Sequence, residues 1–341
     1  MKKTAWLSRK LPDKKVECLA CHHRCKIAEG KTGICGVRAN EGGELKLLVF
    51  GRAASANVDP IEKKPLFHFL PGTQIFSFGT VGCNFRCSFC QNFEISQFSK
   101  SHSRAEIEKF GVDLPPKKIV EICVREKISA IAYTYNEPAV FFEYAFATAK
   151  LAHEKGIRNV FVTSGFESHE ALEKIHPLLD AVNVDLKSFR DDFYIKICGG
   201  RLQPVLENIR WLHANKIWLE ITTLVIPRGN DSENELREIA EFIAGIDPEI
   251  PWHISRYFPC FQMRNPPTPI ATLEKAAEIG KQAGLKNIYV GNISHSNFEN
   301  TICPKCGEVV IRRSGYFTEN FLAGDRCKNC GREIAGVFEK V

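Results

Sequence analysis

Short apolar runs alternate with amphipathic stretches between about residues 74 and 290. The runs are rich in β-branched and aromatic residues and predict seven strands, at residues 75–81, 130–134, 159–163, 181–186, 217–226, 252–257 and 287–291. The stretches between them predict helices at residues 115–127, 138–156, 168–179, 203–215, 232–245 and 271–284. Regular alternation of strand and helix predicts a parallel sheet covered by helices. Because six or seven units are fewer than the eight of a closed barrel, the predicted α/β fold is a partial (β/α)6-type TIM barrel.

Local signals mark where several of these predicted helices begin and end. Ser232, with Glu235 three positions later, predicts a capping box at the start of one helix. Gly156 and Gly284 stand where a glycine commonly ends a helix. In parallel α/β folds the reactive groups gather on loops at the carboxyl ends of the strands. Functional motifs are therefore expected on the loops that follow the predicted strands.

The composition is that of an ordinary globular protein, with 341 residues of which 44% are hydrophobic. This length suggests about two domains. No apolar run approaches the roughly 18 residues of a membrane span, and the start, MKKTAWLSRKLPDKK, becomes polar before a signal-peptide core could form. We therefore expect a soluble, cytoplasmic protein without a membrane partner.

Cysteine is the unusual feature of this composition, because the chain has 14. A protein that is not secreted keeps its thiols reduced and uses clustered thiols for metals or catalysis. Eleven cysteines fall into three groups: Cys18, Cys21, Cys25 and Cys35; Cys83, Cys87 and Cys90; and Cys303, Cys306, Cys327 and Cys330. The groups suggest an N-terminal four-cysteine module at residues 1–50, a barrel at 51–298 and a C-terminal zinc ribbon at 299–341.

Metal ligation changes how the formal net charge of +6 is interpreted. Each bound thiol becomes a thiolate, so two four-thiolate zinc sites and one three-thiolate cluster would lower the net charge to about +1. The basic balance is therefore weak evidence for a nucleic-acid partner.

The middle group lies in the run GTVGCNFRCSFCQN, directly after the first predicted strand, with the spacing C-x3-C-x2-C. Three thiolates on one short loop can bind three irons of a four-iron, four-sulfur ([4Fe-4S]) cluster and leave the fourth iron open for another ligand. The alternatives are a zinc knuckle that borrows a distant ligand, or three incidental thiols.

The C-terminal group has the spacing C-x2-C-x20-C-x2-C, which predicts a structural zinc ribbon with a closed shell of four sulfurs. A rubredoxin-like iron site is the alternative. The N-terminal group has the spacing C-x2-C-x3-C-x9-C, which also predicts a closed metal site, with His22 and His23 as additional candidate ligands. The spacing does not choose between zinc and a second iron-sulfur cluster, and we favour zinc there.

The cysteine loop, with Phe89 immediately before its last cysteine, resembles the signature of radical S-adenosylmethionine (SAM) enzymes. The resemblance implies that Cys83, Cys87 and Cys90 hold a [4Fe-4S] cluster whose open iron is chelated by SAM. It also implies a one-electron donor of the ferredoxin or flavodoxin type. Reductive cleavage of SAM would then give methionine and a 5′-deoxyadenosyl radical that abstracts hydrogen from a substrate.

Further segments continue this resemblance and imply residues that bind SAM. TYNEP (134–138) stands where the superfamily usually has a Gly-Gly-Glu motif, which implies a contact of Asn136 and Glu137 with the SAM amino group. VNVDLKSF (182–189) is similar to the D-x-K motif of glycyl-radical-enzyme activases. It implies Asp185 and Lys187 as candidate residues at the SAM site. Thr163, in the earlier segment VTSGF, also matches the activase pattern. His253 is a further candidate and approaches the pocket with Arg256 and Tyr257. The alternatives are a polar turn at TYNEP, a solvated ion pair at the strand end, and a structural histidine.

Taken over most of its length, the chain is similar to the radical SAM member of the AmmeMemoRadiSam system. This resemblance implies Memo-family and AMMECR-type proteins as partners, but it names no substrate. The leading hypothesis is a radical SAM enzyme acting on an unknown, possibly macromolecular, substrate. The alternatives are a glycyl-radical-enzyme activase and a protein that modifies or binds nucleic acid through the ribbon. Cys123 is expected in the core, and Cys198 and Cys260 are expected on loops near the site, as incidental thiols or radical relays.

Overall fold

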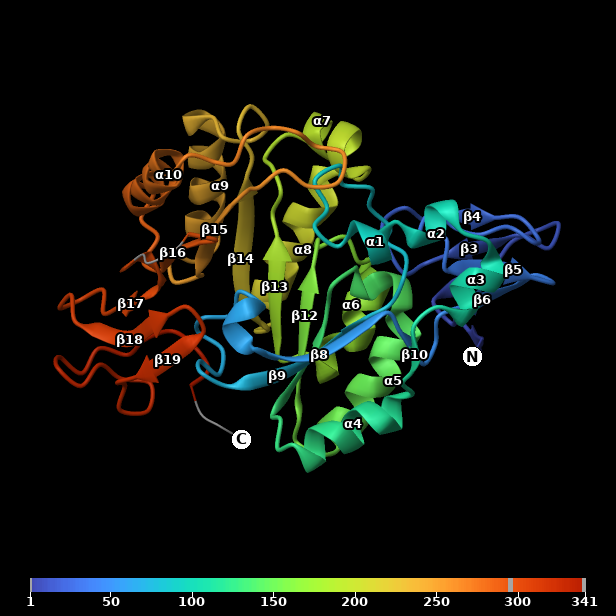
Figure 1. The fold of residues 1–341 in the computed structure, drawn as a ribbon, viewed down its shortest axis with the longest axis horizontal. Coiled ribbons are helices and arrows are strands. Elements are labelled where there is room, and N and C mark those ends of the chain that lie inside the picture. The colour runs from blue at the N-terminus through green and yellow to red at the C-terminus, as the bar shows by residue number, and fades with distance from the viewer. Residues whose placement is uncertain (1, 294–296, 339–341) are drawn as a thin grey trace.

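A computed structural model describes residues 2–293 and 297–338 of the chain. Its centre is an eight-stranded sheet that does not close on itself, with the order β16-β15-β14-β13-β12-β11-β9-β8 (Figure 1). Seven strands are parallel: β9 (Gln74–Gly79), β11 (Ala130–Tyr133), β12 (Arg158–Thr163), β13 (Ala181–Asp185), β14 (Trp218–Val225), β15 (Trp252–Arg256) and β16 (Ile288–Gly291). The predicted partial barrel is therefore confirmed. The sequence pattern missed β8 (Ser55–Pro60), which extends the sheet by pairing antiparallel with β9.

The predicted helices are all present on the outside of the sheet (Figure 1). They are α4 (Pro116–Arg125), α5 (Phe142–His153) after a 3-10 turn η2 (Pro138–Phe141), α6 (His169–Ile175), α8 (Leu202–Ala214), α9 (Glu233–Ile246) and α10 (Ile270–Gln282). Each buries an apolar stripe against the strands, as α9 does with Leu236, Ile239 and Ile243. Gly156 and Gly284 have φ angles of 69° and 99°, as a helix-ending glycine requires.

The capping box predicted at α9 forms only in part. The Ser232 side chain accepts a hydrogen bond from the Glu235 backbone N–H at 3.3 Å. The Glu235 carboxylate does not return to Ser232; it accepts hydrogen bonds from the Ser188 hydroxyl and from the Phe189 N–H, the latter at 2.8 Å. This carboxylate therefore holds the loop that follows β13, a long-range role that the local pattern did not indicate.

The N-terminal module contains two small antiparallel sheets, β2-β3-β4 and β1-β6-β5. Their strands are β1 (Lys3–Thr4), β2 (Ser8–Lys10), β3 (Val16–Cys18), β4 (Lys26–Ile27), β5 (Arg38–Glu41) and β6 (Glu44–Leu47). Arg38 is 2% exposed; it forms an ion pair with Glu143 of α5 and donates to the Val140 carbonyl at 3.0 Å. This buried arginine bonds the module to the barrel, and removing either partner would leave an uncompensated buried charge.

A second connection runs from the cysteine loop to the N-terminal module through three short helices. These are α1 (Phe93–Ser96), α2 (Phe98–Ser101) and α3 (Arg104–Lys109). The chain then forms β10 (Val112–Asp113), which pairs antiparallel with β7 (Arg52–Ala53). The segment after the predicted iron-sulfur motif therefore packs beside the module that carries the first cysteine group (Figure 1).

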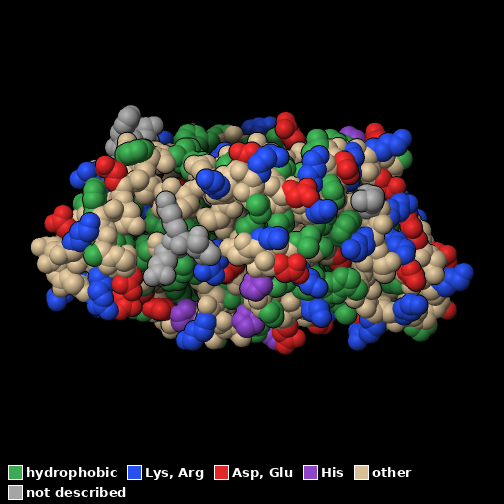
Figure 2. All heavy atoms as spheres, turned by 90° about the horizontal axis from the view of Figure 1, so that it is seen from below, with side chains coloured by type: hydrophobic (Ala, Val, Ile, Leu, Met, Phe, Trp, Pro, Cys, Tyr) green, Lys and Arg blue, Asp and Glu red, His purple; other side chains and the backbone are tan. Residues whose placement is uncertain are grey.

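The C-terminal segment is a three-stranded antiparallel sheet at the opposite end of the molecule from the N-terminal module (Figure 1). It consists of β17 (Thr301–Ile302), β18 (Val309–Ser314) and β19 (Phe317–Asn320). Acidic and basic side chains are interspersed over the face of the molecule seen from below (Figure 2). Among the described residues, no helix is both long and apolar enough to cross a membrane.

Candidate active site

One large cavity, of about 530 Å³, opens at the carboxyl ends of the parallel strands. Cys83, Cys87 and Cys90 all line it, on the loop that follows β9. The backbone N–H of Phe85 donates to the Cys83 sulfur at 3.4 Å, and the Cys90 sulfur lies 3.2 Å from the Ser96 hydroxyl. Phe89 lines the same cavity. The structure therefore brings the three cysteines of the sequence motif to one concave surface.

Burial governs the chemistry of these thiols in the free protein. Burial, with the charge of Glu137, raises the pKa of the Cys83 thiol well above its ordinary value. The hydrogen bond with the Cys198 thiol and burial do the same for Cys87. The thiols hence keep their protons in the absence of metal. Metal binding at this loop therefore releases protons.

Asp185 and Lys187 lie at the end of β13 and line the cavity from the wall that bears that strand. The Lys187 ammonium is 2.8 Å from the Asp185 carboxylate. Burial lowers the pKa of Lys187, but the charge of Asp185 and its hydrogen bond with Lys187 outweigh burial and raise the pKa of Lys187 well above its ordinary value. The cavity thus contains a cation that is fixed beside the cysteine loop and that stays charged at neutral pH.

Glu137 and Thr163, both predicted at the SAM site, do not line the cavity. The Glu137 carboxylate is fully buried and accepts hydrogen bonds from the Thr163 hydroxyl at 2.7 Å and from the Ser164 N–H at 2.9 Å. The Thr163 hydroxyl also lies 2.5 Å from the Glu167 carboxyl. One hydroxyl proton cannot serve two carboxylates, so a carboxyl proton must complete this chain.

The carboxyl that holds the proton can be assigned from the electrostatics of this buried group. Burial and the charge of Glu137 raise the pKa of Glu167 well above its ordinary value. Burial also raises the pKa of Glu137, although hydrogen bonds from Ser164 and Thr163 act in the opposite direction. Glu167 is hence the protonated member, and the pair carries one negative charge behind the cavity wall.

Asn136, the remaining candidate of the TYNEP segment, does line the cavity. Its amide donates to the Gly82 carbonyl at 2.7 Å, and its side-chain oxygen accepts from the Thr80 N–H at 3.2 Å. Asn136 therefore fixes the start of the cysteine loop.

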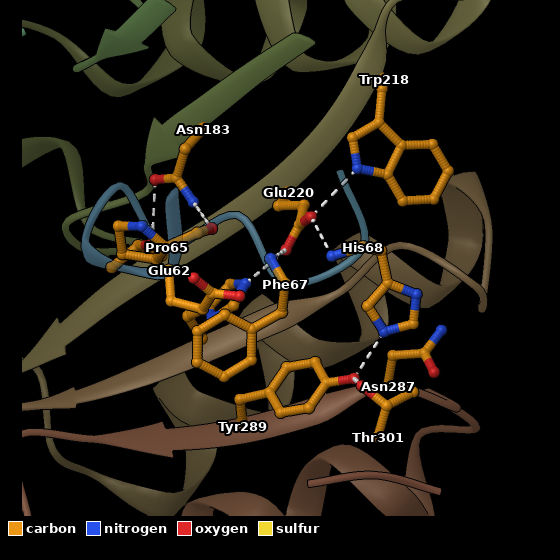
Figure 3. A network of polar contacts seen from close by, with 12 residues as sticks. Glu62, Pro65, Phe67, His68, Asn183, Trp218, Glu220, Asn287, Tyr289 and Thr301 are labelled. Atoms are coloured by element: carbon orange, nitrogen blue, oxygen red, sulfur yellow. Dashed lines mark hydrogen bonds and ion pairs between the residues drawn. The ribbon is translucent and has the colours of Figure 1, made fainter. Parts of the chain in front are cut away.

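His253 also lines the cavity. It contacts Glu220, the centre of a buried polar network (Figure 3). Its Nε2 atom is 2.6 Å from the carboxylate of Glu220, which lies in the middle of β14 and is fully buried. The same carboxylate accepts from the backbone N–H groups of Phe67 and His68 and from the Trp218 indole, at 2.8–3.0 Å. Glu220 thereby holds the segment at residues 61–70 across the barrel.

One expectation about this end of the site was wrong, and one residue was missed. Arg256 and Tyr257 do not line the cavity, because the Arg256 guanidinium is bound to the Thr268 carbonyl at 2.8 Å and Tyr257 is fully buried. Glu220 was missed altogether. Its only signal was an acidic residue within the apolar strand run IWLEITTLVI, where an unpaired charge would be costly.

The isolated cysteines lie close to the cysteine loop, except for Cys123, which is buried in α4. The Cys198 thiol is fully buried and interacts with Cys87, whose pKa it raises. It ends a π-helical turn (Tyr194–Cys198) and not a loop, which corrects the expectation from the sequence. The Cys260 thiol, on a loop as expected, donates to the Cys90 carbonyl at 3.5 Å.

The four C-terminal cysteines form a compact group in which all sulfurs lie within 4.8 Å of one another. The Cys303 and Cys330 sulfurs are 3.5 Å apart, and the Cys306 and Cys327 sulfurs are 3.7 Å apart. Such spacing suits a single tetrahedral metal ion. The N-terminal cysteines surround a separate small cavity, which His23 also lines and His22 does not.

Comparisons with known proteins agree with this fold and with the cysteine loop. The family model of the radical SAM superfamily matches residues 78–243. The protein MJ0808 of Methanocaldococcus jannaschii, described as uncharacterized, is 40% identical over 336 residues, which cover 97% of this chain and 98% of the relative. A putative glycyl-radical enzyme activating enzyme of the same organism, MJ1632, is 28% identical over 52% of this chain and 65% of its own length.

A solved structure shows a similar fold. The radical SAM methyltransferase from Sphaerobacter thermophilus matches with a TM-score of 0.50 and 16% identity, over 65% of this chain and 67% of that protein. The chain belongs to the radical SAM superfamily and is an enzyme. Membership implies a [4Fe-4S] cluster, SAM and an electron donor.

Proposed function

We propose that this enzyme cleaves SAM at a [4Fe-4S] cluster held by Cys83, Cys87 and Cys90 and abstracts hydrogen from a substrate in the same cavity. The observation that carries the proposal is that three thiols of one loop, of which those of Cys83 and Cys87 are buried, line one cavity together with a charged lysine. Three sulfur donors without a fourth are the set that leaves one iron open for SAM. When bound, the cluster supplies the electron that cleaves SAM into methionine and a 5′-deoxyadenosyl radical.

The residues around the loop have distinct proposed roles. Lys187 binds the SAM carboxylate as a point charge, and Asp185 orients Lys187 through their ion pair of 2.8 Å. Asn136 positions the cysteine loop, and Phe89 packs at the cavity wall beside the bound adenosyl group. Glu137 and Thr163 are positioning residues, because they shape the wall without lining the cavity.

The substrate is proposed to bind at the end of the cavity away from the cysteines. That end is lined by His253, Tyr289 and Lys63, and by Gly315 and Tyr316 from the C-terminal sheet. Its wall thus combines aromatic surface with the histidine and a lysine. A cavity of about 530 Å³ that reaches the C-terminal sheet supports a substrate larger than SAM alone, including a segment of a macromolecule.

A glycyl-radical-enzyme activase is the second candidate function. It is favoured by the similarity to a relative described as a putative glycyl-radical enzyme activating enzyme, and by the D-x-K segment at Asp185 and Lys187. The third hypothesis, a nucleic-acid protein, is not favoured by the mixed charges on the face in Figure 2. The partnership with Memo-family and AMMECR-type proteins stays a prediction, as does zinc at the C-terminal cysteines.

The proposal is tested by anaerobic reconstitution with iron and sulfide, reduction, addition of SAM, and measurement of 5′-deoxyadenosine. We expect product from the wild type and none from the Cys87→Ala variant. Cys123→Ala is the matched control, because it removes a buried thiol whose pKa is raised by burial to about 12 and which does not line the cavity. A loaded wild-type enzyme that cleaves no SAM, or a Cys87→Ala variant as active as the control, would refute the proposal.

A further inference from the structure

The N-terminal cysteines surround a small closed space of their own. Cys18, Cys21, Cys25 and Cys35 all line a cavity of about 10 Å³. Beside the cysteines, its wall is largely apolar, with Ala139 and Val140 contributed by the barrel. All the cysteines except Cys25 are buried, and no aspartate or glutamate lines the space. Four sulfur donors without oxygen ligands are a set for zinc or for an iron-sulfur cluster.

The two four-cysteine groups of this chain differ in how closely their sulfurs approach. Four sulfurs around one zinc, each bound at about 2.3 Å, lie about 3.8 Å from one another. The C-terminal group has this arrangement, with sulfur pairs at 3.5 Å and 3.7 Å. In the part of the chain that the structure describes, the N-terminal cysteines do not provide even three sulfurs within 4.8 Å of one another. The N-terminal sulfurs are therefore spaced more widely than the C-terminal ones.

We propose that the N-terminal cavity binds a [4Fe-4S] cluster through Cys18, Cys21, Cys25 and Cys35. In such a cluster each thiolate binds a separate iron at one corner, so the four sulfurs are spaced more widely than around a single ion. This inference concerns residues other than those of the proposed SAM site and does not depend on that proposal.

An unpaired hydrogen-bond donor in the cavity wall points to a ligand there. Asn84 lines the cavity and is 2% exposed, yet its amide Nδ2 has no hydrogen-bond partner among the described residues. A buried amide without a partner is costly, and the sulfur atoms of a cluster accept such hydrogen bonds. Arg38, also in the wall, is a buried cation whose charge is already met by its ion pair with Glu143.

The N-terminal cavity shares a wall with the cysteine loop of the proposed SAM site. Asn84, which lines it, directly follows Cys83, which lines the large cavity. The Ser99 hydroxyl donates to the Cys35 carbonyl at 2.7 Å, and the Lys100 ammonium donates to the Cys83 carbonyl at 3.2 Å. A cluster in the N-terminal module would therefore be a direct neighbour of the other cysteine site.

The test measures metal in a full-length chain without the loop cysteines. We would purify the triple variant Cys83→Ala, Cys87→Ala, Cys90→Ala anaerobically, reconstitute it with iron, sulfide and zinc together, and remove unbound metal. The expected content is about four iron, about four sulfide and about one zinc per chain. Reduction should give an electron paramagnetic resonance signal of a [4Fe-4S] cluster that SAM does not change, because this cluster has no open iron.

A second variant assigns the iron to the N-terminal cysteines. Adding Cys21→Ala and Cys25→Ala to the triple variant should abolish bound iron and sulfide and leave the zinc. Circular dichroism of both variants, compared with the wild type, reports whether the chain still folds. A folded triple variant that contains two zinc and no iron, iron without sulfide, or no metal beyond one zinc would overturn the inference. None of these readouts involves SAM cleavage, so failure here is separate from failure of the proposed function.

Discussion

Single residues in this site act through charges that burial makes expensive to leave unpaired. Lys187 is the clearest case, because its ammonium is held 2.8 Å from Asp185 and faces the cavity beside Cys87. A fixed cation of this kind is well suited to bind a ligand carboxylate. The ion pair with Asp185 already compensates the burial of the Lys187 ammonium in the free enzyme.

Removing this charge should weaken SAM binding. A hydrogen bond to a charged group contributes about 1.5–3 kcal/mol, so Lys187→Met should raise the Kd for SAM by about 10-fold to 150-fold. Lys196→Met is the matched control, because Lys196 forms a similar ion pair, 3.2 Å from Asp192, outside the cavity. The measurement is isothermal titration calorimetry with the anaerobically reconstituted enzyme. Equal Kd values for both variants would show that the SAM carboxylate binds elsewhere.

At the scale of elements, the cysteine loop is held between the end of β9 and the N-terminal module. Gly82 has a φ of 88°, and a Cβ atom there would lie 2.6 Å from Val37 and 2.7 Å from the Cys35 carbonyl oxygen. The absence of a side chain therefore lets the two cysteine-bearing segments touch.

Gly82→Ala should separate these segments and reduce iron binding. The new methyl group meets the Cys35 carbonyl, so the backbone must move in addition to adopting a strained φ. Gly284→Ala is the control: it has a φ of 99°, but no atom lies within 4 Å of the position that its new methyl group would take. We expect the control to lose about 1–2 kcal/mol of its free energy of unfolding, from backbone strain alone. Gly82→Ala should lose more and should also bind less iron. Thermal denaturation measures the stability of the two variants, and iron analysis measures their iron content. Equal stability and equal iron content in Gly82→Ala and Gly284→Ala would contradict this account of the loop.

The elements that could be predicted from sequence are those encoded by local pattern. The strand Ala130–Tyr133 and the helix Glu233–Ile246 carry their own periodicity and boundary signals, and the cysteine spacings are equally local. Contacts between distant segments carry no such signal. Glu220 binds the backbone at Phe67 and His68, about 150 positions earlier in the chain. The Glu137 carboxylate is likewise held by Thr163, which belongs to the next strand. The segment TYNEP alone therefore could not predict that Glu137 does not line the cavity.

At the scale of the whole molecule, one arginine connects the C-terminal sheet to the barrel. The Arg313 side chain is fully buried and donates to the Phe67 carbonyl at 2.6 Å and to the Glu299 carbonyl and Thr301 hydroxyl at 2.9 Å. Its guanidinium also lies 4.2 Å from the centre of the Phe67 ring. Since Phe67 lines the large cavity, this docking shapes the proposed substrate end.

Arg313→Met should therefore destabilise the protein strongly. Removing one partner of a buried charged network costs about 3–5 kcal/mol. Arg312→Met is the matched control on the same strand, because Arg312 is exposed and its ion pair with Glu319, at 3.3 Å, should contribute about 0–1 kcal/mol. Calorimetric Tm values of the two variants, compared at equal metal content, provide the comparison. Similar Tm values would mean that the C-terminal sheet is held by other contacts.

The same interface should also make stability depend on pH through His68. Burial lowers the pKa of His68 from 6.5 to about 4, and its Nδ1 donates to the Ala335 carbonyl at 2.7 Å while its Nε2 accepts from the Tyr289 hydroxyl. In the window between these pKa values the unfolded chain binds a proton that the folded chain does not. The contribution of neutral His68 is thus complete above pH 6.5 and is lost as the pH falls toward 4.

This linkage predicts a difference between the wild type and His68→Gln, whose side chain does not titrate. On going from pH 7 to pH 5, the wild type should lose about 2 kcal/mol more of its free energy of unfolding than the variant does. Urea titrations of the zinc-loaded proteins at both pH values measure this loss, and other titrating groups cancel because they are common to both chains. Equal losses of free energy in the wild type and in His68→Gln would contradict this prediction. They would show that His68 is protonated in the folded protein at no cost, so that the C-terminal sheet tolerates an imidazolium there.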